Sequence, residues 1–133
     1  MDKIHLQPFL DAMHAKNPAA LAAHMSDDVT LRSPILPDPV AGKKPVGDLL
    51  TALLSVVDEF TVTDMIEAGT RAAVFVTIRA GEAQVTGVDD MHVDHDGLVS
   101  AMTIQWRPLG QIVAMQQLLA PVIGAPVMKL IAA

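Results

Sequence analysis

The residue whose position most clearly suggests chemistry is Asp89, an acidic residue inside an apolar strand pattern. Strand alternation over residues 85–93 places Asp89 on the same face as Met91. Residues 94–97 contain a Gly suited to a tight turn, and the next run places Met102, Ile104 and Trp106 on one face. If the two faces lie on the same side of one hairpin, the carboxyl group stands over an apolar floor. The pattern predicts a pocket with one polar group.

The chemistry expected of Asp89 follows from burial. A carboxyl group placed among Met and Trp side chains is driven toward its neutral form, which donates a hydrogen bond. Such a group suits binding of a ligand carbonyl, or acid/base chemistry. The alternative is a structural Asp that is bonded to a backbone N–H or to a buried His.

His24 and Ser33 are two further candidates. His24 follows Leu21 by three residues in a predicted helix, so it can share the inward face and act as a base near Asp89. Its alternative is a helix-end His that a carbonyl or water satisfies. Ser33 is either a pocket hydroxyl or a turn residue before Pro34. No Gly-x-Ser-x-Gly elbow surrounds it, so a nucleophilic role is not expected.

Acidic and His residues crowd the hairpin, which raises the question of a metal site. Asp90, His92 and Asp94 can share a strand face, whereas His95 and Asp96 fall in the turn. The spacing does not match a calcium loop, and no glycine pattern forms a phosphate loop or a dinucleotide site. We expect a solvated acidic hairpin, no metal and no cofactor.

Composition narrows the function classes. The formal net charge is −6 and basic residues do not cluster, which argues against nucleic-acid or anionic-membrane partners. The chain has no Cys, so disulfides and thiolate chemistry are excluded. No apolar run is long enough to span a bilayer, and no signal peptide is apparent, so a cytoplasmic location is expected.

The periodicities predict an α+β domain of helices followed by a meander. The 133 residues suit one domain over 1–133, with a core at about 5–108 and a C-terminal helix and apolar tail at 109–133. Helical spacing begins at Leu6, a second helix runs from Pro18 through Met25, and a third follows Gly42. A short strand is expected at 29–33, between the second and third helices. Longer strands are expected at 60–66, 71–80, 85–93 and 98–107, with a helix at 109–119.

One predicted strand is apolar on both faces. Residues 72–78 read Ala-Ala-Val-Phe-Val-Thr-Ile, whereas a strand with one solvated face should alternate more cleanly. We therefore expect the second face to be covered, either by the C-terminal segment or by another subunit.

Several of these segments resemble the nuclear transport factor 2-like superfamily, and within it the SnoaL-like proteins and ketosteroid isomerases. They are Ser26-Asp27-Asp28-Val29 before a strand that ends at Ser33-Pro34, Gly42-Lys43-Lys44-Pro45 before a helix, and the hairpin that closes on Trp106-Arg107-Pro108. The resemblance implies a cone: a curved antiparallel sheet packed on three N-terminal helices around an apolar cavity. It also implies a homodimer through the convex sheet face.

The comparison with ketosteroid isomerases implies one shared site residue. Asp89 matches the protonated Asp that holds the oxyanion in those enzymes. Their Asp base would fall at Ser33 and their Tyr near Phe9, and neither residue supplies the required group. The chain thus resembles these enzymes in its fold but lacks two of their three catalytic groups, the Asp base and the Tyr hydroxyl. The cavity lining that we expect comprises Phe9, Met13, Ser33, Leu53, Met91, Met102, Ile104 and Trp106.

Two classes of function stay open from the sequence. The first is a cofactor-independent isomerase, cyclase, dehydratase or hydrolase acting on a small apolar carbonyl or cyclic compound, with Asp89 as acid and His24 as base. The second is a module that binds an apolar ligand, or serves in dimerisation, without turnover. The two missing groups favour the second class, and the retained Asp89 favours the first.

Overall fold

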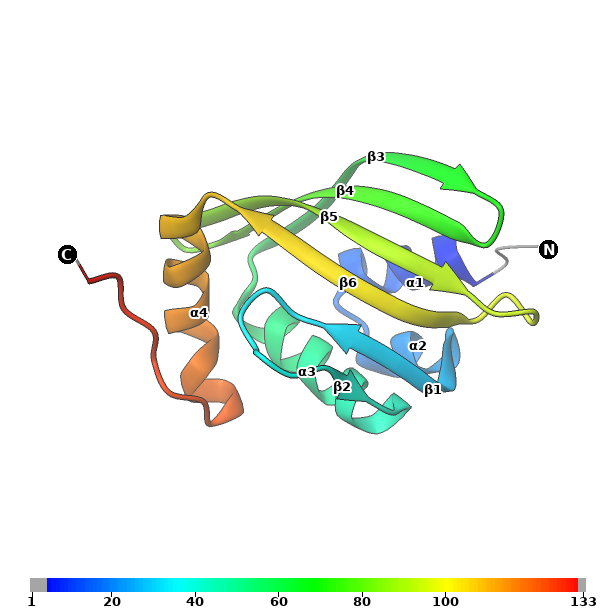
Figure 1. Ribbon diagram of the computed structural model, residues 1–133, viewed down its shortest axis with the longest axis horizontal. Helices are drawn as coiled ribbons and strands as arrows, with labels where there is room; N and C mark the ends of the chain where they lie inside the picture. The colour runs from blue at the N-terminus through cyan, green and yellow to red at the C-terminus, as the bar shows by residue number, and fades with distance from the viewer. Residues whose placement is uncertain (1–4, 132–133) are drawn as a thin grey trace.

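The computed structural model describes residues 5–131, which form four helices on one side of a curved sheet (Figure 1). The helices are α1 (Leu6–Ala15), α2 (Pro18–Ala23), α3 (Lys43–Val56) and α4 (Leu109–Ile123). The strands are β1 (Met25–Arg32), β2 (Val40–Ala41), β3 (Glu59–Ala68), β4 (Arg71–Ala80), β5 (Ala83–Val93) and β6 (Val99–Arg107).

The six strands form one open sheet in the order β2-β1-β6-β5-β4-β3. The pairs from β3 to β6 are antiparallel neighbours, and only the pairing of β1 with β6 is parallel. Figure 1 shows the sheet arched over α1, α2 and α3, with α4 at one end of the arch. The predicted α+β fold, with three N-terminal helices and a C-terminal helix, is confirmed. The parallel pair is the one departure from the expected antiparallel sheet.

The N-terminal helices bury the stripe that their spacing predicts. On α1, Leu6, Phe9 and Met13 are all buried. Asn17 caps α2 by accepting a hydrogen bond from the backbone N–H of Ala20 at 3.3 Å, with Pro18 as the first helical residue. The predicted end of α2 at Met25 is wrong, because that residue already belongs to β1 and pairs with Val99.

The C-terminal helix is longer than predicted and lies on the inner side of the sheet. It continues through Pro121 to Ile123 and ends at Gly124, whose φ of 71° is the left-handed conformation that glycine adopts readily. Leu119 contributes to the central core. Helix α4 therefore does not cover the outer sheet face, for which the C-terminal segment was one of two expected covers. No helix among residues 5–131 is long and apolar enough to cross a membrane.

The tail after α4 folds back along the helix. The side-chain amide of Gln116, which is 3% exposed, donates to the carbonyl of Pro126 and accepts from the N–H of Met128, both at 2.8 Å. Gln117 donates to the carbonyl of Met128 at 2.9 Å. The tail has no neighbouring strand to bond its backbone, so these two side chains serve as the hydrogen-bond partners of Pro126 and Met128.

Candidate functional site

Asp89 lies on the inner face of the sheet. Its direct neighbours are Val74 on β4 and Ile104 on β6, and the same face of β5 carries the buried Met91. Cross-strand partners point to the same side of a sheet. The hairpin therefore brings Asp89, Met102, Ile104 and Trp106 to one face, which meets the condition set from the sequence. A register shift between His92 and Val93 is part of this pairing.

One carboxyl oxygen of Asp89 is buried without a hydrogen-bond partner in the described part of the chain. Asp89 is 7% exposed, and its Oδ1 atom is buried with no hydrogen-bond partner among residues 5–131. Desolvation raises the pKa of this carboxyl group to about 7, because burial penalises the charged form. Near neutral pH the group is therefore divided between an acid that donates a hydrogen bond and a carboxylate that accepts a proton.

Trp106 packs unusually close to the neighbouring strand. It is paired with Gly87, and a Cβ atom at Gly87 would stand 2.7 Å from Trp106 Cδ1 and 2.2 Å from the backbone oxygen of Gln105. The absence of a side chain at Gly87 is what lets the indole ring and β6 approach β5 so closely. The indole Nε1 is itself buried and has no hydrogen-bond partner within the described chain.

This close approach makes Gly87→Ala a sensitive change. We expect it to destabilise the protein by about 1–3 kcal/mol, because the backbone of β6 must move to admit the methyl group. Gly110→Ala is the matched control, since nothing lies within 4 Å of the added Cβ and α4 should gain from the better helix former. Urea unfolding of both variants measures the difference. Equal stabilities would show that the strand accommodates a Cβ freely.

A small cavity lies beside Trp106, bounded by four elements. Its volume is about 10 Å³, roughly the room that one water molecule needs. The lining residues come from β1 and the following loop, α3, β6 and α4: Leu31, Ser33, Ile35, Leu49, Leu53, Ile104, Trp106 and Leu119. Leu119 of α4 thus closes one side of the cavity in this conformation.

The expected lining residues divide into two groups. Ser33, Leu53, Ile104 and Trp106 do line the cavity, and Ser33 Oγ accepts a hydrogen bond from the N–H of Ile35 at 3.2 Å. The others are buried in the continuous core around the cavity and do not line it: Phe9, Met13, Met91 and Met102.

Sequence reasoning missed Leu31, Ile35, Leu49 and Leu119 as lining residues. Strand alternation predicted that Leu31 is buried, and the helical stripe predicted the same for Leu49. Burial alone does not show whether a residue lines a cavity or lies in the solid core. Asp89 itself does not line the cavity and adjoins it through its cross-strand neighbour Ile104.

His24 lies away from Asp89. Its carbonyl accepts a hydrogen bond from Val99, at the far end of β6 from Ile104. Val99 and Ile104 are five steps apart along the strand, which corresponds to roughly 16 Å. His24 Nδ1 instead faces His5 Nδ1 at 3.0 Å, and burial together with the charge of His5 lowers the pKa of His24. The structure does not bring the two predicted catalytic residues together.

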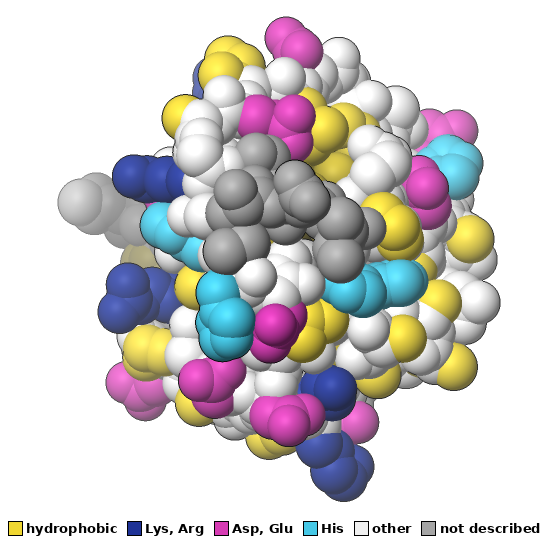
Figure 2. All heavy atoms as spheres, turned by 90° about the vertical axis from the view of Figure 1, so that its right-hand side faces the viewer, with side chains coloured by type: hydrophobic (Ala, Val, Ile, Leu, Met, Phe, Trp, Pro, Cys, Tyr) yellow, Lys and Arg dark blue, Asp and Glu magenta, His cyan; other side chains and the backbone are white. Residues whose placement is uncertain are grey.

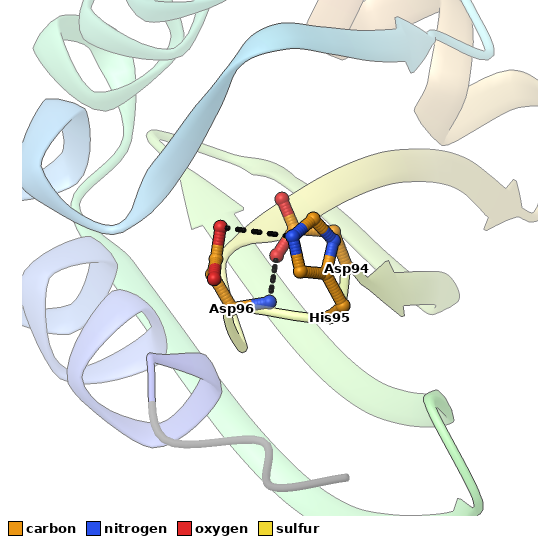
Figure 3. Close-up of side chains that lie close together, drawn as sticks. All are labelled: Asp94, His95 and Asp96. Atoms are coloured by element: carbon orange, nitrogen blue, oxygen red, sulfur yellow. Dashed lines mark hydrogen bonds and ion pairs between the residues drawn. The ribbon is translucent and has the colours of Figure 1, made fainter.

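The acidic hairpin turn has a structural explanation. Figure 3 shows Asp94, His95 and Asp96 close together in the β5–β6 turn, where one ligand atom from each lies within 4.8 Å of the others. Asp94 Oδ1 already accepts the backbone N–H groups of Asp96 at 2.9 Å and Leu98 at 3.1 Å, which closes the turn. His95 and Asp96 are exposed. Figure 2 shows acidic and His side chains gathered at this end of the molecule, the opposite end from α4.

Most of the chain matches one known protein family. The family model described as a SnoaL-like domain matches residues 6–102. The chain belongs to the SnoaL-like domain family. The match ends within β6, so α4 and the tail lie beyond the part that the family model describes.

This SnoaL-like protein is similar in sequence or in structure to several known proteins. It is 31% identical over 109 residues to a steroid Δ-isomerase of Nocardioides simplex, covering 79% of this chain and 89% of that protein. A crystal structure of a steroid Δ-isomerase from Pseudomonas aeruginosa superposes with a TM-score of 0.84 at 21% identity, covering 91% and 90% of the two chains. A computationally designed 17-OHP binder gives 0.68 at 22%, covering 81% and 91%.

Proposed function

We propose that this SnoaL-like protein binds a small apolar carbonyl or cyclic molecule on the inner face of its sheet. Asp89 in its neutral form would donate a hydrogen bond to the ligand's oxygen. The observation that carries the proposal is the buried Asp89 Oδ1 without a protein partner. Leaving such an atom unpaired costs about 1–3 kcal/mol, and a ligand acceptor would recover that cost.

The relatives support the same class of ligand. The sequence relative is named for a steroid, and the designed protein is named for binding 17-OHP. The structures of a steroid Δ-isomerase from Pseudomonas aeruginosa and of that designed binder share this fold. The cavity of about 10 Å³ is far smaller than the roughly 300 Å³ or more of typical ligand pockets. Binding of anything larger than a few atoms would therefore require Leu119 and α4 to shift.

We place binding ahead of turnover. Acid/base catalysis needs a base within hydrogen-bond reach of the reacting group. Ser33 stands where the resemblance to ketosteroid isomerases puts that base, and His24 is held by His5 instead. The enzyme alternative is a cofactor-independent isomerase, cyclase or hydrolase in which Asp89 alone exchanges the proton, and its pKa of about 7 is the observation that favours it.

The test is titration of the full-length protein with cyclohexanone and with methylenecyclohexane, which replaces the oxygen by a methylene group. We expect the ketone to bind more tightly below pH 7 and to lose that advantage above it, because Asp89 then loses its proton. Asp89→Asn should remove this pH dependence, because the Asn amide can donate a hydrogen bond to the ketone at every pH and cannot ionise. Asp90→Asn, one residue further and on the outer face, is the control.

One outcome would exclude Asp89 from binding, and another would favour the enzyme alternative. A ketone affinity of the wild type that does not change between pH 5 and pH 8 would remove Asp89 from the binding site. Deuterium uptake from D2O at the carbon next to the ketone, lost in Asp89→Asn, would show turnover and favour the enzyme alternative.

We also propose that two copies associate through the outer face of the sheet. Cross-strand pairs place Ile66 beside Ala73 and Phe75 beside Val88 on that face, and Ile66 is 60% exposed. Figure 1 shows every helix on the other side of the sheet. The bidentate ion pair of Arg71 with Asp90, at 2.8 Å for both bonds, would form part of a polar rim.

Sedimentation velocity at tens of micromolar tests this association. We expect a dimer for the wild type and a monomer for Ile66→Asp, because a buried unpaired carboxylate opposes contact. Leu109→Asp is the control, since Leu109 is as exposed but lies at the start of α4. A wild-type monomer at that concentration would refute the proposal.

A further inference from the structure

Trp106 carries a second unused hydrogen-bonding group on the inner face. Its Nε1 is buried and has no hydrogen-bond partner among residues 5–131. An indole N–H can only donate, so it needs an acceptor atom nearby. Buried Trp N–H groups usually find a partner. This donor is therefore an exception that needs an explanation.

The position of Trp106 supplies one. Its side chain lines the cavity together with Ser33, Ile104 and Leu119, and the other lining groups are aliphatic. Ser33 Oγ already accepts the N–H of Ile35, which leaves its hydroxyl hydrogen as the second donor at the cavity. Ser33 Oγ also keeps one lone pair, whereas Trp106 Nε1 only donates. The lining side chains thus offer more donors than acceptors, so the cavity suits a molecule that brings an acceptor atom.

Gly87 keeps the donor in place. The indole Cδ1, the carbon bonded to Nε1, lies where a Cβ of residue 87 would be 2.7 Å away. The ring is therefore held against the backbone of β5 by close packing and not by a hydrogen bond. Its N–H is positioned before any ligand arrives, which lowers the entropy cost of using it.

We infer that the Trp106 indole N–H is a ligand-recognition group that donates to an acceptor oxygen of an apolar ligand in this cavity. The inference rests on the proposed function, and it adds a donor that is independent of Asp89. The ligand class is accordingly a largely hydrocarbon molecule with an oxygen acceptor, such as a ketone, ester or ether, and not a pure hydrocarbon or an amine salt.

The single Trp makes the test direct, because the protein has one indole N–H signal. The full-length protein, labelled with ¹⁵N, is titrated with cyclohexanone and with methylenecyclohexane. We expect the ketone to move the indole proton signal downfield and the hydrocarbon to leave it nearly unchanged. The affinity ratio of ketone to hydrocarbon should fall by roughly 2- to 10-fold in Trp106→Phe, the effect of one hydrogen bond.

A second variant separates the donor from the ring's shape. Replacing the sole Trp by benzothienylalanine puts a sulfur where the N–H stood and keeps the bicyclic ring. It should lose the ketone preference as Trp106→Phe does. If either variant keeps the wild-type ratio, or if both molecules move the indole signal equally, the inference is wrong.

The same titrations distinguish this inference from the proposed function. A ketone preference that falls above pH 7 in the wild type, loses that pH dependence in Asp89→Asn and is unchanged in the Trp106 variants would leave the proposed function standing and overturn the role of Trp106. Failure of both molecules to bind the wild type up to their solubility limits would overturn both proposals together.

Discussion

Asp89→Asn should abolish a loss of stability that the wild-type protein shows between pH 5 and pH 8. The carboxyl group has a pKa of 3.8 when unfolded and about 7 in the folded protein, so folding favours its neutral form. The contribution of Asp89 to stability is highest at low pH and falls as the unfolded chain ionises at this residue above pH 4 while the folded group stays protonated. The fall ends above pH 7, where both states are ionised.

The expected size follows from the raised pKa. The complete penalty corresponds to roughly 4 kcal/mol, and about 2–3 kcal/mol of it develops between pH 5 and pH 8. Denaturant unfolding of the wild type and of Asp89→Asn at both pH values measures it, because the amide cannot ionise. The difference between the two pH values matters more than either absolute stability, since the Asn amide has its own bonding needs.

Asp90→Asn is the matched control for this measurement. Arg71 donates two hydrogen bonds to Asp90 and lowers its pKa, so any pH effect has the opposite sign: stability is lost as pH falls. The pair is exposed, and we expect less than about 1 kcal/mol. A fall of several kcal/mol for Asp89→Asn at both pH values would instead identify Asp89 as a structural hydrogen-bonding centre.

Leu119→Ala should destabilise the protein by about 2–5 kcal/mol and enlarge the cavity. Leu119 is 2% exposed and lines the cavity of about 10 Å³, so its removal adds the volume of the lost side chain to a space that already exists. An apolar cavity of that kind binds benzene or xenon. We therefore expect benzene to raise the melting temperature of Leu119→Ala and to have no such effect on the wild type.

Leu118→Ala is the neighbouring control. Leu118 is 44% exposed on the same helix, and its truncation should cost less than about 1 kcal/mol. If Leu119→Ala gains no affinity for benzene, α4 has collapsed into the space. Ligand admission would then depend on motion of the whole helix instead of on one side chain.

Local patterns in the sequence were sufficient to predict the Asp89 face. The period of two determines which residues within β5, and which within β6, share a side. That the two sides coincide also depends on a register shift between His92 and Val93, which the alternation did not indicate. The helical stripe of α1 and the cap at Asn17 are local in the same sense. Each of these predictions involves residues that are close along the chain.

Tertiary structure alone decided which of these elements meet. The parallel pairing of β1 with β6, the contact of His24 with His5 and the closure of the cavity by Leu119 join segments that are far apart in the sequence. Such contacts depend on how complete elements pack against one another, and no spacing rule specifies them. For the same reason the sequence by itself predicted a polar group over an apolar floor, whereas the unpaired Trp106 N–H and the small volume beside it emerged only from the folded chain.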